Sequence, residues 1–271
     1  MSMRFLRRRW LAAAFAAALV GCAAPTAQPP AATASARAVL APTGKLRVGL
    51  YPGSPTSLVA DRQGQPAGVA HDLGRELARR LNVPFEPVRF HRLAEVVAAV
   101  KRGEVDFTFT NASPARARDV QFTAPLMKVE LGYLVPRGSS VQSLADVDRA
   151  GVRVGVSEGS SSQAALAREY RQARLVPVPS LDVAGQMLRG AQLDAFATNK
   201  GILHELADQV PGARILEGRW GMEHMAIAVP KGREAALPDL NDFAAAIQRD
   251  GVLKAALARS GLRGAVEAGS P

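Results

Sequence analysis

Two hydrophobic periods alternate along most of the chain, and they predict strands that are each followed by a helix. In the stretch VDFTFT at 105–110, Val105 and two phenylalanines fall on one face of a strand, while Asp106 and two threonines fall on the other. The stretch DLGRELARRL at 72–81 instead has leucines at 73, 77 and 81 on one face of a helix, which Asp72 is expected to cap. The pattern therefore predicts an α/β protein.

The strand–helix order occurs twice. The first unit is predicted to have strands and helices at 46–51, 72–81, 85–90, 93–103 and 105–111. The second unit has the same order, at 152–157, 161–170, 173–178, 181–190 and 193–199. Each βαβαβ unit implies a mostly parallel sheet flanked by helices. Because RGEVDFTFTN, which ends the first unit, resembles RGAQLDAFATN, which ends the second, we expect two lobes built alike.

Two short apolar stretches flank the second unit, and each ends in proline, a basic residue and glycine. They are GYLVPRG at 132–138 and AIAVPKG at 226–232. If both cross between the lobes, lobe 1 consists of residues 44–136 plus 226–271, and lobe 2 of residues 137–225. A hinge made of two strands allows such lobes to close on a ligand.

The beginning of the chain has the pattern of an export signal. Four arginines precede an apolar run at 10–20, which is too short to span a membrane and suits a signal peptide. The run ends in LVGC, which resembles the bacterial lipobox, so we predict a signal peptide at 1–21 and a lipid on Cys22. Cys22 is the only cysteine, so no disulfide within the chain is expected. Residues 22–43 are expected to form a lipidated flexible tether, and the chain is expected in the periplasm, anchored to a membrane.

Composition excludes some functions. The formal net charge of +10 falls to +6 without the four arginines of the signal segment, and aromatic residues make up only 5% of the chain. The basic residues are scattered, so nucleic acid is not expected as a partner. The spacing of His71, His91 and His204 matches no zinc site, and neither a metal nor a cofactor is expected.

The end of the predicted strand at 105–111 suits an anion. Ligands of open α/β sheets bind beyond the carboxyl ends of the strands, where Thr110 and Asn111 lie. Ser113 can cap the next helix, and Arg116 in its first turn offers a fork that binds a carboxylate with two hydrogen bonds. Arg118, two residues further on, is expected to point to solvent.

The second unit offers a matching site after its first strand. Gly159 permits a tight turn, and Ser160 and Ser161 present hydroxyl groups beside a helix start. Two anion-binding sites, one in each lobe, suit a small anionic or zwitterionic ligand held between them.

The folded part resembles the family 3 extracellular solute-binding proteins of bacterial ABC importers, which typically bind polar amino acids. The resemblance rests on the order and spacing of GKLRVG, GVAHDLGRELARRL, EVVAAVKRGEVD, SPARARDVQFTAPL, LADVDRAGVRVGVSEGSS and AIAVPKG. It implies a two-lobed periplasmic-binding-protein fold of type II. It also implies a monomer without enzymatic activity that delivers its ligand to an ABC permease. By position, Arg116 would bind an α-carboxylate, assisted by Ser113 and Ser161.

The sequence departs from the family pattern at two places. Asn199 stands where the family usually has an aspartate that pairs with the ligand ammonium, and an amide cannot supply that charge. The early loop YPGSPTSLV has Tyr51 as its only aromatic residue and places Ser54 where an aromatic side chain would cover the ligand. A carboxylate without an ammonium group therefore competes with an amino acid as the expected ligand.

Two other functions stay open at this point. The same two-lobed fold serves as a sensor domain that reports to a membrane receptor, and sequence does not separate sensing from transport. The fold also resembles dehydratases and lytic transglycosylases, which need a general acid in the cleft. The candidates are Glu158, Glu223 and His224, and we interpret all three as surface or hinge residues.

Overall fold

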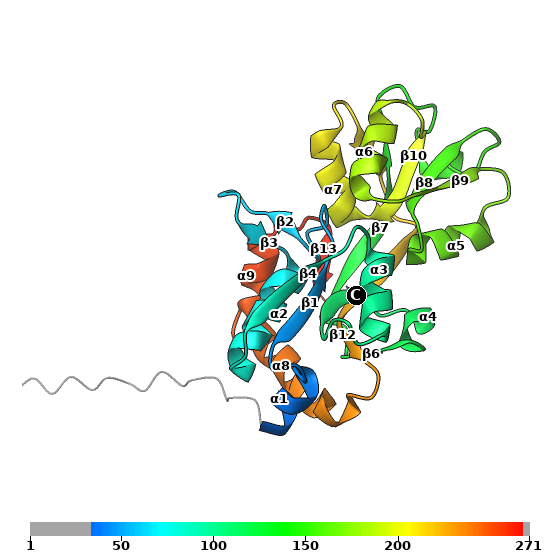
Figure 1. The fold of residues 1–271 in the computed structure, drawn as a ribbon. Coiled ribbons are helices and arrows are strands. Elements are labelled where there is room, and N and C mark those ends of the chain that lie inside the picture. The colour runs from blue at the N-terminus through cyan, green and yellow to red at the C-terminus, as the bar shows by residue number, and fades with distance from the viewer. Residues whose placement is uncertain (1–33, 268–271) are drawn as a thin grey trace, which may run out of the picture. The chain divides into compact units, whose positions relative to one another are not determined.

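The computed structural model describes residues 34–267, and within them the predicted strand–helix order is present twice (Figure 1). The first unit contains β1 (Leu46–Leu50), α2 (Val69–Leu81), β4 (Phe85–Arg89), α3 (Leu93–Lys101) and β5 (Thr108–Asn111). The second unit contains β8 (Arg153–Ser157), α5 (Ser161–Glu169), β9 (Arg174–Val178), α6 (Leu181–Arg189) and β10 (Ala195–Asn199). The predicted α/β class and its two βαβαβ units are therefore confirmed.

The strands of the two units are arranged in the same order. In the first unit β1 pairs in parallel with β4. Val48 of β1 also forms an isolated parallel bridge with Phe107, the residue before β5. In the second unit β8 pairs in parallel with both β9 and β10. One antiparallel strand completes each set: β12 (Gly221–Pro230) pairs with β5, and β7 (Met127–Val135) pairs with β10. Within residues 34–267 the strands β5, β12, β7, β10, β8 and β9 follow one another in that order in a single mixed sheet of nine strands, and β1 and β4 form a separate two-stranded parallel sheet.

The long strands β7 and β12 also pair with each other, and this pairing joins the two units. Met225 lies opposite Met127, and Gly221 lies opposite Leu131. Leu131 pairs with Asn199 in β10 as well. The predicted two-strand hinge is present, and it begins before the expected stretch at 132–138.

The remaining elements extend the two units. Short strands add to β7, β12 or each other: β6 (Val120–Phe122), β11 (Arg214–Ile215), β13 (Ala265–Glu267), and the pair β2 (Val59–Ala60) and β3 (Pro66–Ala67). Helices α8 (Leu237–Arg249) and α9 (Val252–Arg259) pack with α2 into the apolar core of the first unit. Helix α7 (Lys200–Gln209) packs with α6 into the core of the second. The C-terminal helices thus complete the first unit after the chain has returned from the second.

An arginine–aspartate pair joins the first and last strands of both units. The backbone N and the Nε of Arg47 both donate to Oδ2 of Asp106 at 2.9 Å, and Nη2 donates to Oδ1 at 2.8 Å. Arg153 makes the same three bonds to Asp194, at 2.8, 2.9 and 2.8 Å. We call these the two aspartate clamps. Their identity in detail confirms that RGEVDFTFTN and RGAQLDAFATN occupy equivalent places.

The clamp of the first unit is the more deeply buried one. The side chain of Asp106 is 0% exposed and accepts a further bond from Nη2 of Arg233 at 2.7 Å. The side chain of Asp194 is 24% exposed, and among the described residues Arg153 is its one ion-pair partner. Arg233 also donates from Nη1 to the carbonyl oxygen of Leu40, so it ties the start of the described chain to this clamp.

The structure corrects the predicted tether over part of its length. Helix α1 (Ala34–Leu40) lies within residues that were expected to be flexible, and the side chains of Ala36 and Leu40 are buried in the core of the first unit. The folded part therefore begins before residue 44. The predicted signal peptide and Cys22 lie outside the described residues.

The structure also corrects the start of the helix predicted at 72–81. Helix α2 begins at Val69, because carbonyl oxygens of the preceding loop, those of Pro55 and Thr56, accept its first N–H groups. Asp72 does not cap the helix; its carboxylate accepts from Nδ1 of His71 and Nε of Arg259, each at 2.8 Å. Burial alone would raise the pKa of Asp72, but the bonds from His71 and Arg259 hold it below its ordinary value.

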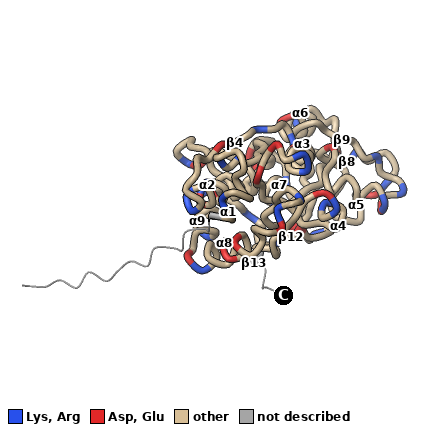
Figure 2. The backbone as a smooth tube through the Cα atoms, turned by 60° about the horizontal axis from the view of Figure 1, so that its bottom comes forward, with Lys and Arg blue, Asp and Glu red and all other residues tan. Residues whose placement is uncertain are grey.

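Charged residues of both signs are interspersed along the described backbone (Figure 2). No helix within residues 34–267 is long and apolar enough to cross a membrane.

Candidate functional site

Arg116 is buried at the carboxyl end of β5, held by the residues predicted around it. Helix α4 (Pro114–Ala117) begins after Ser113, whose hydroxyl oxygen accepts from the backbone N of Arg116 at 3.3 Å. Nη1 of Arg116 donates to Oγ1 of Thr110 at 2.9 Å and to the carbonyl oxygen of Asn111 at 3.4 Å. Four of the predicted site residues therefore meet here, three of them positioning the fourth.

The other terminal nitrogen of this guanidinium is unsatisfied. Arg116 is 8% exposed, and its Nη2 is buried without a hydrogen-bond partner among the described residues. Burial lowers the pKa of Arg116, and the carboxylate of Glu223 opposes that shift. Arg118 is exposed, as predicted. A buried guanidinium N–H without a partner is costly in a protein interior and marks a place where an acceptor is missing.

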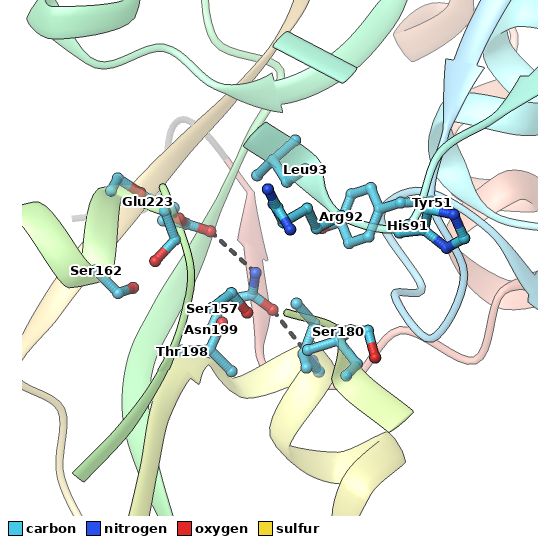
Figure 3. A pocket seen from close by; sticks show the side chains of 14 residues that line it. Tyr51, His91, Arg92, Leu93, Ser157, Ser162, Ser180, Thr198, Asn199 and Glu223 are labelled. Atoms are coloured by element: carbon cyan, nitrogen blue, oxygen red, sulfur yellow. Dashed lines mark hydrogen bonds between the residues drawn. The ribbon is translucent and has the colours of Figure 1, made fainter. Parts of the chain in front are cut away.

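A cavity between the two units contains further predicted residues (Figure 3). Tyr51 and Arg92 line it from the first unit, and Ser160, Ser161 and Asn199 line it from the second. Its volume is about 30 Å³, which is room for about two water molecules. Burial raises the pKa of Tyr51, and the charges of Glu223 and Arg116 both act on it, so the cavity and Arg116 lie within electrostatic reach of each other.

Ser160 and Asn199 are N-caps of helices, and the sequence predicted a helix start at Ser160. The hydroxyl oxygen of Ser160 accepts from the backbone N of Gln163 at 3.1 Å and caps α5. The Oδ1 of Asn199 accepts from the backbone N of Ile202 at 3.1 Å and caps α7.

Gly159, before α5, lies close to the first unit. Its φ is +72°, and a Cβ there would lie 2.7 Å from that of Ala94 in α3. A larger residue at this position would therefore separate the two units.

Ser54 does not take part in the cavity, contrary to the prediction. Its side chain is 0% exposed, and its hydroxyl bonds to Oγ1 of Thr56 at 2.9 Å inside the loop that follows β1. The neighbouring Ser57 accepts from the backbone N of Tyr51 at 2.9 Å. The serines of this loop hold its shape, while Tyr51 lines the cavity.

Glu223 was interpreted as a surface or hinge residue; it does lie in the stretch of β12 that pairs with β7 at the hinge, but it is not on the surface. It lies on β12, is 6% exposed and lines the cavity. Its Oε1 accepts from Oγ of Ser161 at 3.1 Å, and its Oε2 accepts from Nδ2 of Asn199 at 3.0 Å. His224, the next residue, is exposed. The alternation of β12 carried a signal for this, because Glu223 shares a face with the buried Met225 and Ile227.

Arg92 is a second cation that sequence analysis missed. It precedes α3, lines the cavity, and its Nε is buried without a partner in the described part of the chain. Its Nη1 lies 3.1 Å from Oε2 of Glu158 in the second unit and 3.5 Å from Oε1 of Glu95 in α3. Glu158 is therefore a rim residue that contacts the first unit. Within residues 34–267 no group of three His, Cys, Asp or Glu residues is placed to hold a metal ion.

Comparisons with known proteins agree with this architecture. An amino-acid-binding protein of Dichelobacter nodosus, AabA, is 22% identical over 202 residues, covering 72% of this chain and 79% of its own. The ABC transporter glutamine-binding protein GlnH of Bacillus subtilis is 21% identical over 192 residues, covering 69% of this chain and 70% of its own.

Solved structures show the same two-lobed arrangement. A solute receptor for L-cysteine from Neisseria gonorrhoeae is 26% identical and superimposes with a TM-score of 0.72, covering 83% of this chain and 92% of the receptor. The fold is therefore the predicted periplasmic-binding-protein fold. The profile of the bacterial extracellular solute-binding proteins, family 3, matches residues 46–260, most of the chain, and the chain belongs to that family.

Proposed function

We propose that this protein is the ligand-binding component of an ABC importer and captures a small amino acid or related carboxylate. The observation that carries the proposal is the buried Nη2 of Arg116, which lacks a partner among the described residues. A ligand carboxylate supplies the missing acceptor with a charge-assisted hydrogen bond. The names of the relatives, which bind amino acids, glutamine and L-cysteine, support an amino acid as the ligand class.

The ligand occupies the space between the two units and makes contacts to both. Thr110 and Asn111 hold one side of the guanidinium, which leaves Nη2 for the carboxylate. Ser160, Ser161 and Asn199 face the ligand from the second unit, and Tyr51 covers it from the first. Residues from both units are needed, so binding energy is available to drive closure.

Entry requires the two units to separate. A cavity of about 30 Å³ is smaller than a ligand with several non-hydrogen atoms needs. The ion pair between Arg92 and Glu158 joins the units beside the cavity, at 3.1 Å, and must open for the ligand to pass. The pairing of β7 with β12 connects the units throughout this movement. The protein alternates between an open form that admits the ligand and a closed form for the permease.

Isothermal titration of the purified protein with L-amino acids, dicarboxylates and other small organic acids tests the proposal. A ligand at a hundred times its dissociation constant stabilises the fold by about 2.7 kcal/mol, which raises the melting temperature by roughly 5–11 °C. Arg116→Ala should weaken binding at least about 30-fold, because a buried carboxylate loses its charge partner. Arg118→Ala changes an exposed arginine directly after the same short helix; it is the matched control and should bind normally. Unchanged affinity in Arg116→Ala, or no ligand among these acids, would refute the proposed site.

The cellular location is a second part of the proposal. We infer that the chain is exported, that it is cleaved before Cys22, and that a lipid on Cys22 anchors it to a membrane on the periplasmic side. The support is the LVGC motif after an apolar run, which lies outside the described residues. Cell fractionation should find the protein with membranes and Cys22→Ser in the soluble periplasmic fraction. Recovery of Cys22→Ser with membranes would contradict the anchor.

The proposal includes no chemical reaction: the ligand is released in the form in which it was bound. The support is that the matching relatives are named as binding proteins. Prolonged incubation of the protein with its ligand, followed by NMR of the solution, should show no product.

A further inference from the structure

Glu223 is a buried carboxylate whose direct partners are neutral. It is 6% exposed, and both of its oxygens accept hydrogen bonds, from the hydroxyl of Ser161 and the amide of Asn199. No Lys, Arg or His within residues 34–267 forms an ion pair with it. A buried charge is expensive unless an opposite charge compensates it. Glu223 therefore lacks a cation in the same way that Arg116 lacks an acceptor.

The two incompletely satisfied charges lie within electrostatic reach of each other. Glu223 lines the cavity, and Asn111 links its neighbour His224 to Arg116: Oδ1 of Asn111 accepts from the backbone N of His224, and its carbonyl oxygen accepts from Nη1 of Arg116. Arg116 is buried, with Nη2 unpartnered in the described part of the chain. Glu223 and Arg116 are too far apart to form an ion pair with each other, yet the charge of Glu223 acts on Arg116. A zwitterion placed between them satisfies both, with its anionic group on Arg116 and its cationic group on Glu223.

Asn199, which stands where the family usually has an aspartate, is in direct contact with the carboxylate of Glu223 on β12. Asn199 uses Oδ1 to cap α7 and Nδ2 to hold Oε2 of Glu223 at 3.0 Å, as the dashed lines in Figure 3 show. Both polar atoms of its side chain are therefore held by the protein, with one N–H of the amide left over. The charge that sequence analysis found missing at Asn199 is present 24 residues later in the chain, in direct contact with the same side chain.

We propose that Glu223 binds the ammonium group of an α-amino acid and so selects amino acids over acids that lack this group, with Asn199 as a positioning residue. The inference rests on the proposed function, because it assumes that Arg116 binds the ligand carboxylate. It differs from the sequence interpretation, in which the missing aspartate left a carboxylate without an ammonium group as a rival to an amino acid.

Paired ligands provide the test. The probes are the twenty L-amino acids and L-cystine, together with hydroxy acids that replace the ammonium by a hydroxyl group, such as L-lactate for L-alanine, L-malate for L-aspartate and L-3-phenyllactate for L-phenylalanine. Affinities are measured by isothermal titration on the protein and on Glu223→Gln. The unchanged protein should bind at least one amino acid more tightly than its hydroxy acid. Glu223→Gln should lose about 30-fold or more in affinity for the amino acid.

The controls separate charge from structure. Glu217→Gln removes the same charge at an exposed position away from the cavity and should change affinity by less than about threefold. Hydroxy-acid binding should be unchanged or stronger in Glu223→Gln, which also shows that this variant is folded. Asn199→Ser keeps a residue that caps helices but removes the donor to Glu223. It should lower the ratio of amino-acid to hydroxy-acid affinity. The melting temperature of the unliganded protein should stay close to that of the unchanged protein.

The outcomes distinguish the two proposals. If the protein binds acids through Arg116 but Glu223→Gln leaves the preference for the ammonium group unchanged, the role of Glu223 is refuted and the proposed function stands. A protein that prefers hydroxy acids refutes the role of Glu223 in the same way. If no probe binds, or if Arg116→Ala binds every probe as the unchanged protein does, the proposed function itself fails.

Discussion

The two aspartate clamps allow one substitution to be made twice in the same protein, in two different environments. Asp106→Asn and Asp194→Asn each replace a carboxylate that accepts three bonds from one arginine. Asp106 is 0% exposed and also pairs with Arg233, whereas the side chain of Asp194 is 24% exposed. Removing one partner of a buried ion pair costs about 3–5 kcal/mol, because the remaining charges stay buried without compensation. Asp106→Asn should therefore lose about 3–5 kcal/mol, and Asp194→Asn clearly less, since water reaches that clamp.

Urea unfolding followed by circular dichroism measures both losses in parallel. For a protein of this size a loss of about 3–5 kcal/mol corresponds to a fall in melting temperature of roughly 6–20 °C. Asp106→Asn should show this fall with an unchanged denaturant slope, which indicates that the native state has kept its compactness. Equal losses for the two substitutions, or a larger loss for Asp194→Asn, would refute the argument that burial and the second arginine set the strength of the clamp.

Three further predictions concern the fold. Gly68→Ala should cost about 3 kcal/mol or more in the free energy of unfolding, because Gly68 has a φ of +138° and a Cβ there would lie 2.2 Å from a backbone oxygen. Gly64→Ala, where φ is +75° and the space is open, should cost only about 1–2 kcal/mol, and similar losses would contradict the steric argument. Leu40→Ala should cost about 2–5 kcal/mol in the free energy of unfolding, because Leu40 is buried in the core. Arg37→Ala, on the exposed face of the same helix, should cost about 0.5 kcal/mol or less. Urea midpoints measure both, and equally small losses would show that α1 does not contribute to the core. Burial raises the pKa of all three tyrosines above the ordinary value of 10.0, that of Tyr133 to about 12, so the stability that they contribute is present below pH 10 and is lost as the pH rises through the raised values. The native protein should show little tyrosinate absorbance at pH 10 and the urea-unfolded protein should show much more, and ordinary titration of the native protein would contradict the burial of Tyr51, Tyr133 and Tyr170.

Hydrophobic periodicity was sufficient for most of the architecture, because each period reports which face of an element is buried. It predicted the ten elements of the two βαβαβ units and their equivalence, which the clamps of Asp106 and Asp194 make concrete. It did not predict α1, since the tether composition at 22–43 carries no period and Leu40 is held by Arg233, 193 residues away. The start of α2 was missed for a similar reason, because loop carbonyl oxygens rather than a side chain satisfy its first N–H groups.

For the site, sequence reasoning reached the residues that lie next to each other in the chain. Arg116 and the residues that hold it span only a few positions, and a strand end followed by a helix start placed them together. Glu223 was missed because its role depends on Ser161 and Asn199, which belong to other elements. A shift of one residue along β12 would exchange Glu223 with the exposed His224, so the register with β7 fixes Glu223 as the one that faces the cavity.

The pairing of β12 with β5 has a consequence for the order in which the protein forms during synthesis. His224 in β12 bonds to Asn111 at the end of β5, and the two residues are 113 positions apart in the chain. The second unit lies wholly between them, so a ribosome releases all of its strands before β12 has emerged. Contacts between distant residues form slowly because a long loop must close first. The inserted unit is therefore able to fold while the first is still incomplete, with one edge of β5 unpaired. Until β12 has emerged, the nascent chain exposes a strand edge that a chaperone or a second nascent chain can bind.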